Sequence, residues 1–168
     1  IKLQKLMKKK RDIVFPLLRL LLGWIFLWPF LDKLFGLNFT TTPDKSWLLG
    51  NSPTTGFLLN AARGPFSGLF QSLADQPLVD WLFMIGLLLI GLSLILGILI
   101  RVAAYSGTLL LMLMWLAVLP PEHNPFLDEH IIYSLVLISL TKINSTKYLS
   151  IAKIWSKTEI VKKYSFLE

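Results

Sequence analysis

Long apolar runs alternate with polar segments along the chain and predict helices that cross a membrane. One uncharged run covers residues 81–100 and a second covers 102–119. At about 1.5 Å per residue, each is long enough to cross most or all of a hydrocarbon core of about 30 Å. Only Arg101 separates them. We therefore expect two antiparallel neighbouring helices joined by a tight turn, the first over about 78–100.

Two further spans are expected on either side of this pair. The first covers 13–35, and Arg19 interrupts its apolar run. No small-residue cleavage site follows, so this span is predicted to be a retained anchor rather than a signal peptide. The other covers 125–145, because Asn124 is a favoured helix cap and Pro125 suits the first helical position.

The remaining segments are predicted to be loops and surface helices. Residues 36–77 are rich in Thr, Pro, Gly and Asn, which break regular structure; short helices are expected there over 54–62 and 66–73. The tail, 146–168, alternates Lys with apolar residues and predicts an amphipathic helix on the membrane surface. The predicted fold is an all-α, antiparallel four-helix membrane bundle, a single domain over 1–168.

Composition and charge support this interpretation. Only 16% of the residues are charged and 54% are hydrophobic, whereas about a quarter of a soluble domain is charged. The net charge is +7, and 12 of the 17 basic residues lie at the two ends: Lys2, Lys5, Lys8, Lys9, Lys10, Arg11, Lys142, Lys147, Lys153, Lys157, Lys162 and Lys163. Basic flanks of apolar spans are typical of cytoplasmic segments, so both termini are predicted to be cytoplasmic. Basic and aromatic residues are not interleaved as in a nucleic-acid groove.

Cofactor signatures are missing from the sequence. There is no cysteine, which excludes disulfides and thiolate metal sites. No flavin fingerprint is present, and His123 and His130 straddle a predicted helix start, where they are poorly placed to sandwich a haem. A metal site among these histidines and the neighbouring acids would lack any HExxH-like spacing. The chain is therefore predicted to hold no metal, flavin or haem.

Most acidic residues and both histidines fall on the predicted extracytoplasmic side, many of them near helix ends. Carboxylates lie beside imidazoles on either side of the start of the last span, a combination that suits proton uptake or release. The simpler interpretation is that the acids cap this helix. The candidate catalytic residues are Glu122, His123, Asp128, Glu129 and His130.

Candidate binding residues come from the first two spans and the loop between them. Asp32 and Lys33 could form an ion pair with Asp80, or Lys33 could face an anion or a quinone carbonyl. Arg19 lies within a span, where an arginine is either functional or extends back to the headgroups. An ordinary polar rim with an aromatic belt would contain the same residue types. The candidates are Arg19, Trp28, Asp32, Lys33, Arg63, Asp80 and Trp81.

Several short motifs are distributed over roughly residues 12–142. They are Leu18-Arg19, the run from Gly23-Trp24 to Pro29-Phe30, Asp32-Lys33, the loop from Gly50-Asn51-Ser52-Pro53 to Phe57-Leu58, Gly91, Gly97-Ile98, Arg101-Val102-Ala103-Ala104, Pro120-Pro121-Glu122-His123-Asn124-Pro125 and Asp128-Glu129-His130. Together they resemble the DoxX/DoxD membrane family, and the closer similarity is to the DoxD branch.

The resemblance implies the large subunit of a thiosulfate:quinone oxidoreductase in the cytoplasmic membrane. Such a subunit oxidises thiosulfate to tetrathionate, uses membrane quinone as substrate, pairs with a smaller DoxA-like subunit and associates with a terminal quinol oxidase. The alternative is a non-catalytic accessory subunit that stabilises such an oxidase. A transporter is disfavoured, because the two uncharged spans offer no polar path through the membrane.

Overall fold

The computed structural model describes residues 2–143, 145–146 and 148–164, and in this part of the chain it contains helices and loops but no strand. Three helices have 18 residues or more: α1 (Lys2–Phe35), α4 (Pro77–Leu96) and α5 (Ile100–Ala117). The stretch Ile13–Phe35 and the whole of α4 and α5 are long and apolar enough to cross a membrane. An all-helical chain with apolar spans, the coarser part of the sequence prediction, is confirmed.

The fourth long helix, α6 (Glu129–Leu140), is shorter than the predicted 125–145. Asn124 does not cap it, because its Oδ1 accepts hydrogen bonds from the amides of Phe126 (3.0 Å) and Leu127 (2.9 Å) and closes a separate turn. The helix begins instead after Asp128, whose side chain accepts from the amide of His130. The sequence therefore has two residues that can cap a helix, Asn124 and Asp128, and α6 starts at the second.

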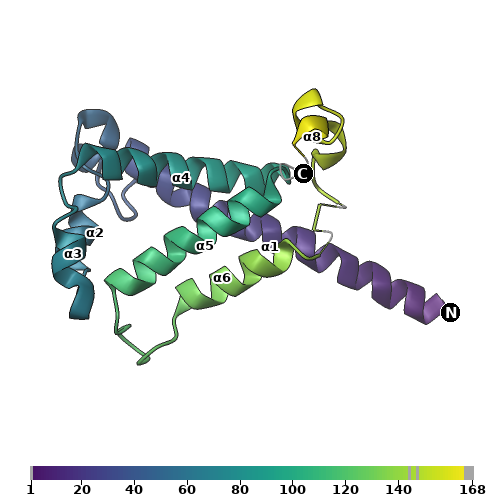
Figure 1. Cartoon of the computed structure of the whole chain (residues 1–168), viewed down its shortest axis with the longest axis horizontal. Helices are drawn as coiled ribbons and strands as arrows, with labels where there is room; N and C mark the ends of the chain where they lie inside the picture. Colours follow the sequence, from purple (N-terminus) through teal and green to yellow (C-terminus); the bar gives the residue numbers. More distant parts are fainter. Residues whose placement is uncertain (1, 144, 147, 165–168) are drawn as a thin grey trace.

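The long helices form two packed pairs, α1 with α4 and α5 with α6, and α4 also contacts α5 (Figure 1). Gly23 and Gly91 allow α1 and α4 to approach closely. A Cβ on Gly91 would lie 2.9 Å from the backbone nitrogen of Leu27, so the small residues set the distance between these helices. The core between the pairs consists of Leu22, Phe26, Leu87, Ile90, Leu94, Ile100, Ala103, Ala104, Leu111, Leu137 and Leu140.

The molecule has two chemically different ends. At one, which we call the loop end, residues 36–76 contain short helices, and residues 118–128 join α5 to α6. The helices are η1 (Pro43–Lys45), η2 (Trp47–Leu49), α2 (Thr55–Asn60), η3 (Gly64–Phe66) and α3 (Ser67–Gln71). The opposite end, the basic end, carries the α4–α5 turn and the tail (Figure 1). Two short helices, α7 (Ala152–Trp155) and α8 (Glu159–Lys163), replace the single tail helix expected over 146–168, of which 147 and 165–168 lie outside the described residues.

The α4–α5 turn is made by residues with left-handed backbone conformation. Gly97 has φ +74°, a conformation that glycine adopts without steric cost. Its backbone N–H donates a hydrogen bond to the Ser93 carbonyl and so ends α4. Leu99, at φ 52°, precedes α5. Arg101 therefore belongs to the first turn of α5 rather than to the connection itself.

Arg19 joins three segments at the basic end. Its side chain is fully buried. Its Nη1 donates to the carbonyls of Leu94 and, at 2.9 Å, Ile95, which end α4. Its Nε donates to Ser145 O at 3.2 Å, and its Nη2 donates to Leu149 O at 2.6 Å. Arg19 thus acts as a shared C-terminal cap for α4 and the segment after α6.

We expect Arg19→Met to destabilise the protein by roughly 3 kcal/mol or more, because each hydrogen bond from a charged donor contributes about 1.5–3 kcal/mol and the carbonyls would lose their partner. Thermal unfolding in detergent measures this loss. Arg63→Met removes an exposed arginine that makes one surface hydrogen bond; it is the control and should cost clearly less stability than Arg19→Met. Equal effects of the two substitutions would contradict the structural role of Arg19.

Gly91→Ala should destabilise the protein, whereas Gly86→Ala on the same helix should not. The added methyl at Gly91 meets the backbone of Leu27, but at Gly86 it meets nothing within 4 Å. Overpacking costs typically about 1–3 kcal/mol, while alanine in an open helical position adds up to about 1 kcal/mol of helix propensity. Paired unfolding curves in one detergent test the difference, and destabilisation by both variants would disprove the close approach.

Candidate functional site

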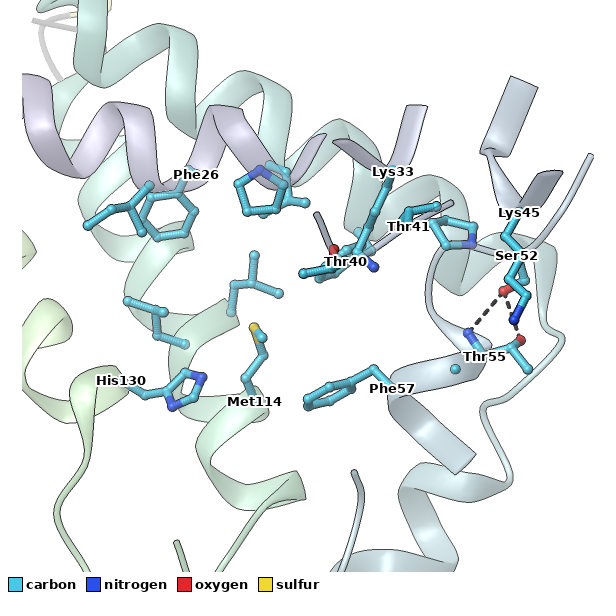
Figure 2. A pocket seen from close by; sticks show the side chains of 18 of the residues that line it. Phe26, Lys33, Thr40, Thr41, Lys45, Ser52, Thr55, Phe57, Met114 and His130 are labelled. Atoms are coloured by element: carbon cyan, nitrogen blue, oxygen red, sulfur yellow. Dashed lines mark hydrogen bonds between the residues drawn. The ribbon is translucent and has the colours of Figure 1, made fainter. Parts of the chain in front are cut away.

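A cavity of about 750 Å³ lies among α1, α4, α5, α6 and the long loop at the loop end. Figure 2 shows Lys33 entering it from α1 and His130 from α6 on the opposite side, with Met114 between them and Phe57 beside Met114. Its inner walls are apolar, with Ile25, Phe26, Pro29, Phe83, Leu87, Leu110 and Leu111. The polar lining residues come mostly from the loop and from the first turn of α6. The cavity therefore suits a ligand with a flat or apolar body and a few polar atoms.

Asp32 fixes the first part of the loop over this cavity. Its carboxylate is 1% exposed and accepts hydrogen bonds from the amides of Phe39 (3.2 Å), Thr40 (2.8 Å) and Thr41 (3.1 Å) and from the Thr40 hydroxyl (2.6 Å). Four donors on a buried carboxylate make a charge-assisted anchor. The loop is consequently folded back against the end of α1, with Thr40 and Thr41 facing the cavity.

Asp80, in the first turn of α4, holds the second part of the loop. Its Oδ1 accepts from the hydroxyls of Ser52 (2.7 Å) and Thr54 (2.5 Å). Ser52 in turn accepts from the amide and hydroxyl of Thr55 (Figure 2). Both carboxylates expected to pair with Lys33 are thus occupied by the loop.

Lys33 is left facing the cavity with a free ammonium group. Its side chain is half-buried, and among the described residues its Nζ has no hydrogen bond or ion pair. A lysine held beside an apolar cavity without a bound partner can donate to a carbonyl or an anion that enters. Lys45, exposed on the loop, lines the same cavity and adds a second positive charge there.

His130 forms the opposite polar wall together with Asp128. Nδ1 of His130 lies 2.8 Å from Oδ2 of Asp128. The carboxylate therefore orients the imidazole and leaves Nε2 available to a ligand. Glu129 and Tyr133 line the cavity beside it. Of the five candidate catalytic residues, the structure brings Glu129 and His130 to the cavity, with Asp128 behind them.

The other sequence candidates lie elsewhere. Glu122 and His123 are exposed in the 118–128 connection and do not line the cavity, because the Asn124 turn separates them from α6. Arg63 donates from Nε to Val118 O at 3.2 Å on the surface. Arg19 lies at the basic end.

Two tryptophan candidates make aromatic contacts away from the lining. Trp28 packs edge-to-face with Phe39 at 4.8 Å between ring centroids. Trp81 packs with Trp47 at 4.7 Å. Both pairs join a long helix to the loop and so contribute to holding the loop in place.

Several lining residues are not among the sequence candidates. Thr40, Thr41 and Ser52 belong to the segment that the sequence predicts only to break regular structure, although the run of hydroxyl residues shortly after Asp32 is a signal that they fold together. Tyr133 follows His130 by about one helical turn and was identifiable from that spacing. Within the described segments, no three His, Asp or Glu side chains are grouped as metal ligands would be.

Comparisons with protein-family models, curated proteins and solved structures gave no match. The resemblance to the DoxX/DoxD family therefore stays a prediction from its motifs, and the cavity has to be interpreted from its own chemistry. The cavity has apolar walls, and a lysine, an oriented histidine and several loop hydroxyls line it as well. It can hydrogen-bond a ligand from two sides and exchange protons with it.

Asp32→Asn should loosen the loop without unfolding the helices. The amide keeps one acceptor oxygen but loses the charge that strengthens four hydrogen bonds. We expect hydrogen exchange at the amides of Phe39, Thr40 and Thr41 to become about tenfold faster or more, with α4 and α5 unaffected. Glu122→Gln, at an exposed acid in the other connection, is the control; unchanged exchange in the Asp32 variant would contradict the anchor.

Proposed function

We propose that the chain is a four-helix membrane subunit with the basic end in the cytoplasm, and that its cavity binds the head of a membrane quinone. The basic-residue distribution supports the orientation, because the tail and Arg101 lie at one end and the acids of the candidate site at the other. Arg19 also brings residues 145–149 beside the end of α4, as expected if α6 completes an even number of crossings.

The shortness of α6 is compatible with a fourth crossing. Twelve residues span only about 18 Å, so non-helical backbone must cover the rest. Such backbone is tolerated at membrane depth where protein surrounds it. Ser145 and the carbonyls around it meet this condition, because Arg19 lies against them.

The observation that carries the quinone proposal is the placement of Lys33 and His130 on opposite sides of one apolar cavity (Figure 2). A quinone ring is flat and apolar with a carbonyl oxygen at each end, so it requires donors from two directions. Its reduction consumes two electrons and two protons. His130, oriented by Asp128, can supply a proton at one carbonyl, and Lys33 can stabilise negative charge at the other.

The proposed electron donor is thiosulfate, following the family resemblance. Two thiosulfate dianions lose two electrons to become tetrathionate, and one quinone with two protons takes up these electrons to become quinol. Lys33 and Lys45 supply two positive charges at the cavity, where Asp75 and Glu129 supply two negative ones. A dianion would therefore be held by direct contact with a lysine rather than by net positive potential. Electrons would pass directly or through a partner, for which a DoxA-like subunit and a terminal quinol oxidase are the proposed candidates.

The alternative is an accessory subunit that stabilises a terminal oxidase. Outward-facing apolar residues such as Leu82, Leu109 and Leu135 would serve it as well as they serve lipid contact. It does not require an unpaired lysine facing an oriented histidine, which is why we favour the quinone site.

The test is thiosulfate-dependent reduction of a quinone analogue by the intact purified complex. His130→Ala should lower the rate about 100-fold or more, and Lys33→Met about tenfold. The control His123→Ala removes an exposed histidine outside the cavity and should retain activity.

If the complex binds quinone but does not reduce it with thiosulfate, the cavity is still supported as a quinone site, and thiosulfate is disproved as the electron donor. No activity and no quinone binding in an intact wild-type complex would disprove the proposal and favour the accessory role.

A further inference from the structure

A second cavity, of about 400 Å³, lies at the basic end between the start of α5, the end of α6 and the tail. It is separate from the loop-end cavity and shares no lining residue with it. Among the described residues that line it, Arg101 and Lys153 are basic and none is acidic.

A buried hydroxyl in this cavity lacks a partner. Ser145 is 1% exposed, lines the cavity, and its Oγ makes no hydrogen bond to any described residue. A buried polar atom without a partner costs roughly 1–3 kcal/mol, so such atoms often indicate a ligand or water. A ligand oxygen could accept from this hydroxyl.

The backbone around the cavity adds positive potential. The 18-residue helix α5 begins here, with no acidic residue in its first turn and no side-chain cap. No described side chain therefore offsets the positive end of its dipole. The negative end of the neighbouring α4 is already neutralised, because Arg19 binds the carbonyls of Leu94 and Ile95. Arg19 also donates to Ser145 O, which places a buried cation next to the cavity wall.

We infer that this cavity binds a phosphate group, and that the phosphate belongs to the headgroup of an anionic phospholipid. Arg101, Lys153, the Ser145 hydroxyl and the amides of α5 are the donors that a phosphate ester requires. The adjoining tail exposes apolar residues, including Ile151, Ile154 and Ile160, which favour a position at the headgroup layer of a bilayer. Basic pockets between helices at this level suit anionic headgroups.

The experiment measures stabilisation of the purified full chain by dioctanoyl phosphatidylglycerol, dioctanoyl phosphatidylcholine and inorganic phosphate in one detergent. Phosphatidylglycerol should raise the unfolding temperature with saturation, and phosphatidylcholine should not. The double variant with Arg101→Gln and Lys153→Gln should bind phosphatidylglycerol at least about tenfold more weakly. The matched control, with Lys142→Gln and Lys157→Gln, removes two exposed lysines outside the cavity and should bind as wild type.

Ser145→Ala separates binding from folding. Because the hydroxyl is unpartnered, its removal should leave unfolding in the absence of lipid unchanged or slightly improved, yet weaken phosphatidylglycerol binding severalfold. Equal stabilisation by both lipids, or wild-type affinity in the Arg101/Lys153 variant, would overturn the proposal. Saturable stabilisation by inorganic phosphate alone would support the phosphate site and overturn its assignment to a lipid.

Discussion

The buried guanidinium of Arg19 is the interaction on which the rest of the architecture depends. A membrane helix ends with unsatisfied carbonyls, and in an apolar environment these cannot be left without donors. Arg19 supplies donors to the end of α4 and to the chain after α6 at the same time. Its position in α1 therefore fixes how α1, α4 and α6 are aligned along their axes. The alignment in turn determines that the far ends of α1 and α6 face each other, where Lys33 and His130 meet.

At the loop end, two carboxylates hold neighbouring segments in place through hydrogen bonds, as Arg19 does at the basic end. Asp32 collects three loop amides and a hydroxyl, and Asp80 collects two hydroxyls. Each buried charge is satisfied by dipoles rather than by an opposite charge. Asp32 attracts Lys33 electrostatically, but no ion pair or hydrogen bond among the described residues occupies the Lys33 Nζ, which is left for a ligand in the cavity. Asp32 and Asp80 thus influence the cavity without contacting a ligand. Because they bind the loop, neither forms an ion pair with Lys33.

The sequence was sufficient for the apolar helices, since their length and lack of charge depend on local composition alone. It also predicted one polar cluster at the outer helix ends that included Lys33 and His130. The same prediction placed Glu122 and His123 in the cluster, whereas neither lines the cavity. It was not sufficient for α6, where Asn124 and Asp128 are equally good caps and only the turn closed by Asn124 decides between them. Nor could it give the roles of Asp32, Asp80 and Arg19, because their partners are backbone groups that carry no sequence signature.

These charged side chains fall into two groups: those that hydrogen bonds within the protein occupy, and those that line cavities and can contact a ligand. Arg19, Asp32 and Asp80 are almost inaccessible, and each holds a segment that would otherwise leave backbone dipoles unsatisfied. Lys33, His130, Arg101 and Lys153 line cavities and are less completely occupied by the protein itself. In a small membrane protein a charged side chain is costly whichever role it has. A structural charge therefore differs from a ligand-binding charge in how many hydrogen-bond partners the protein gives it, and not in its position along the sequence.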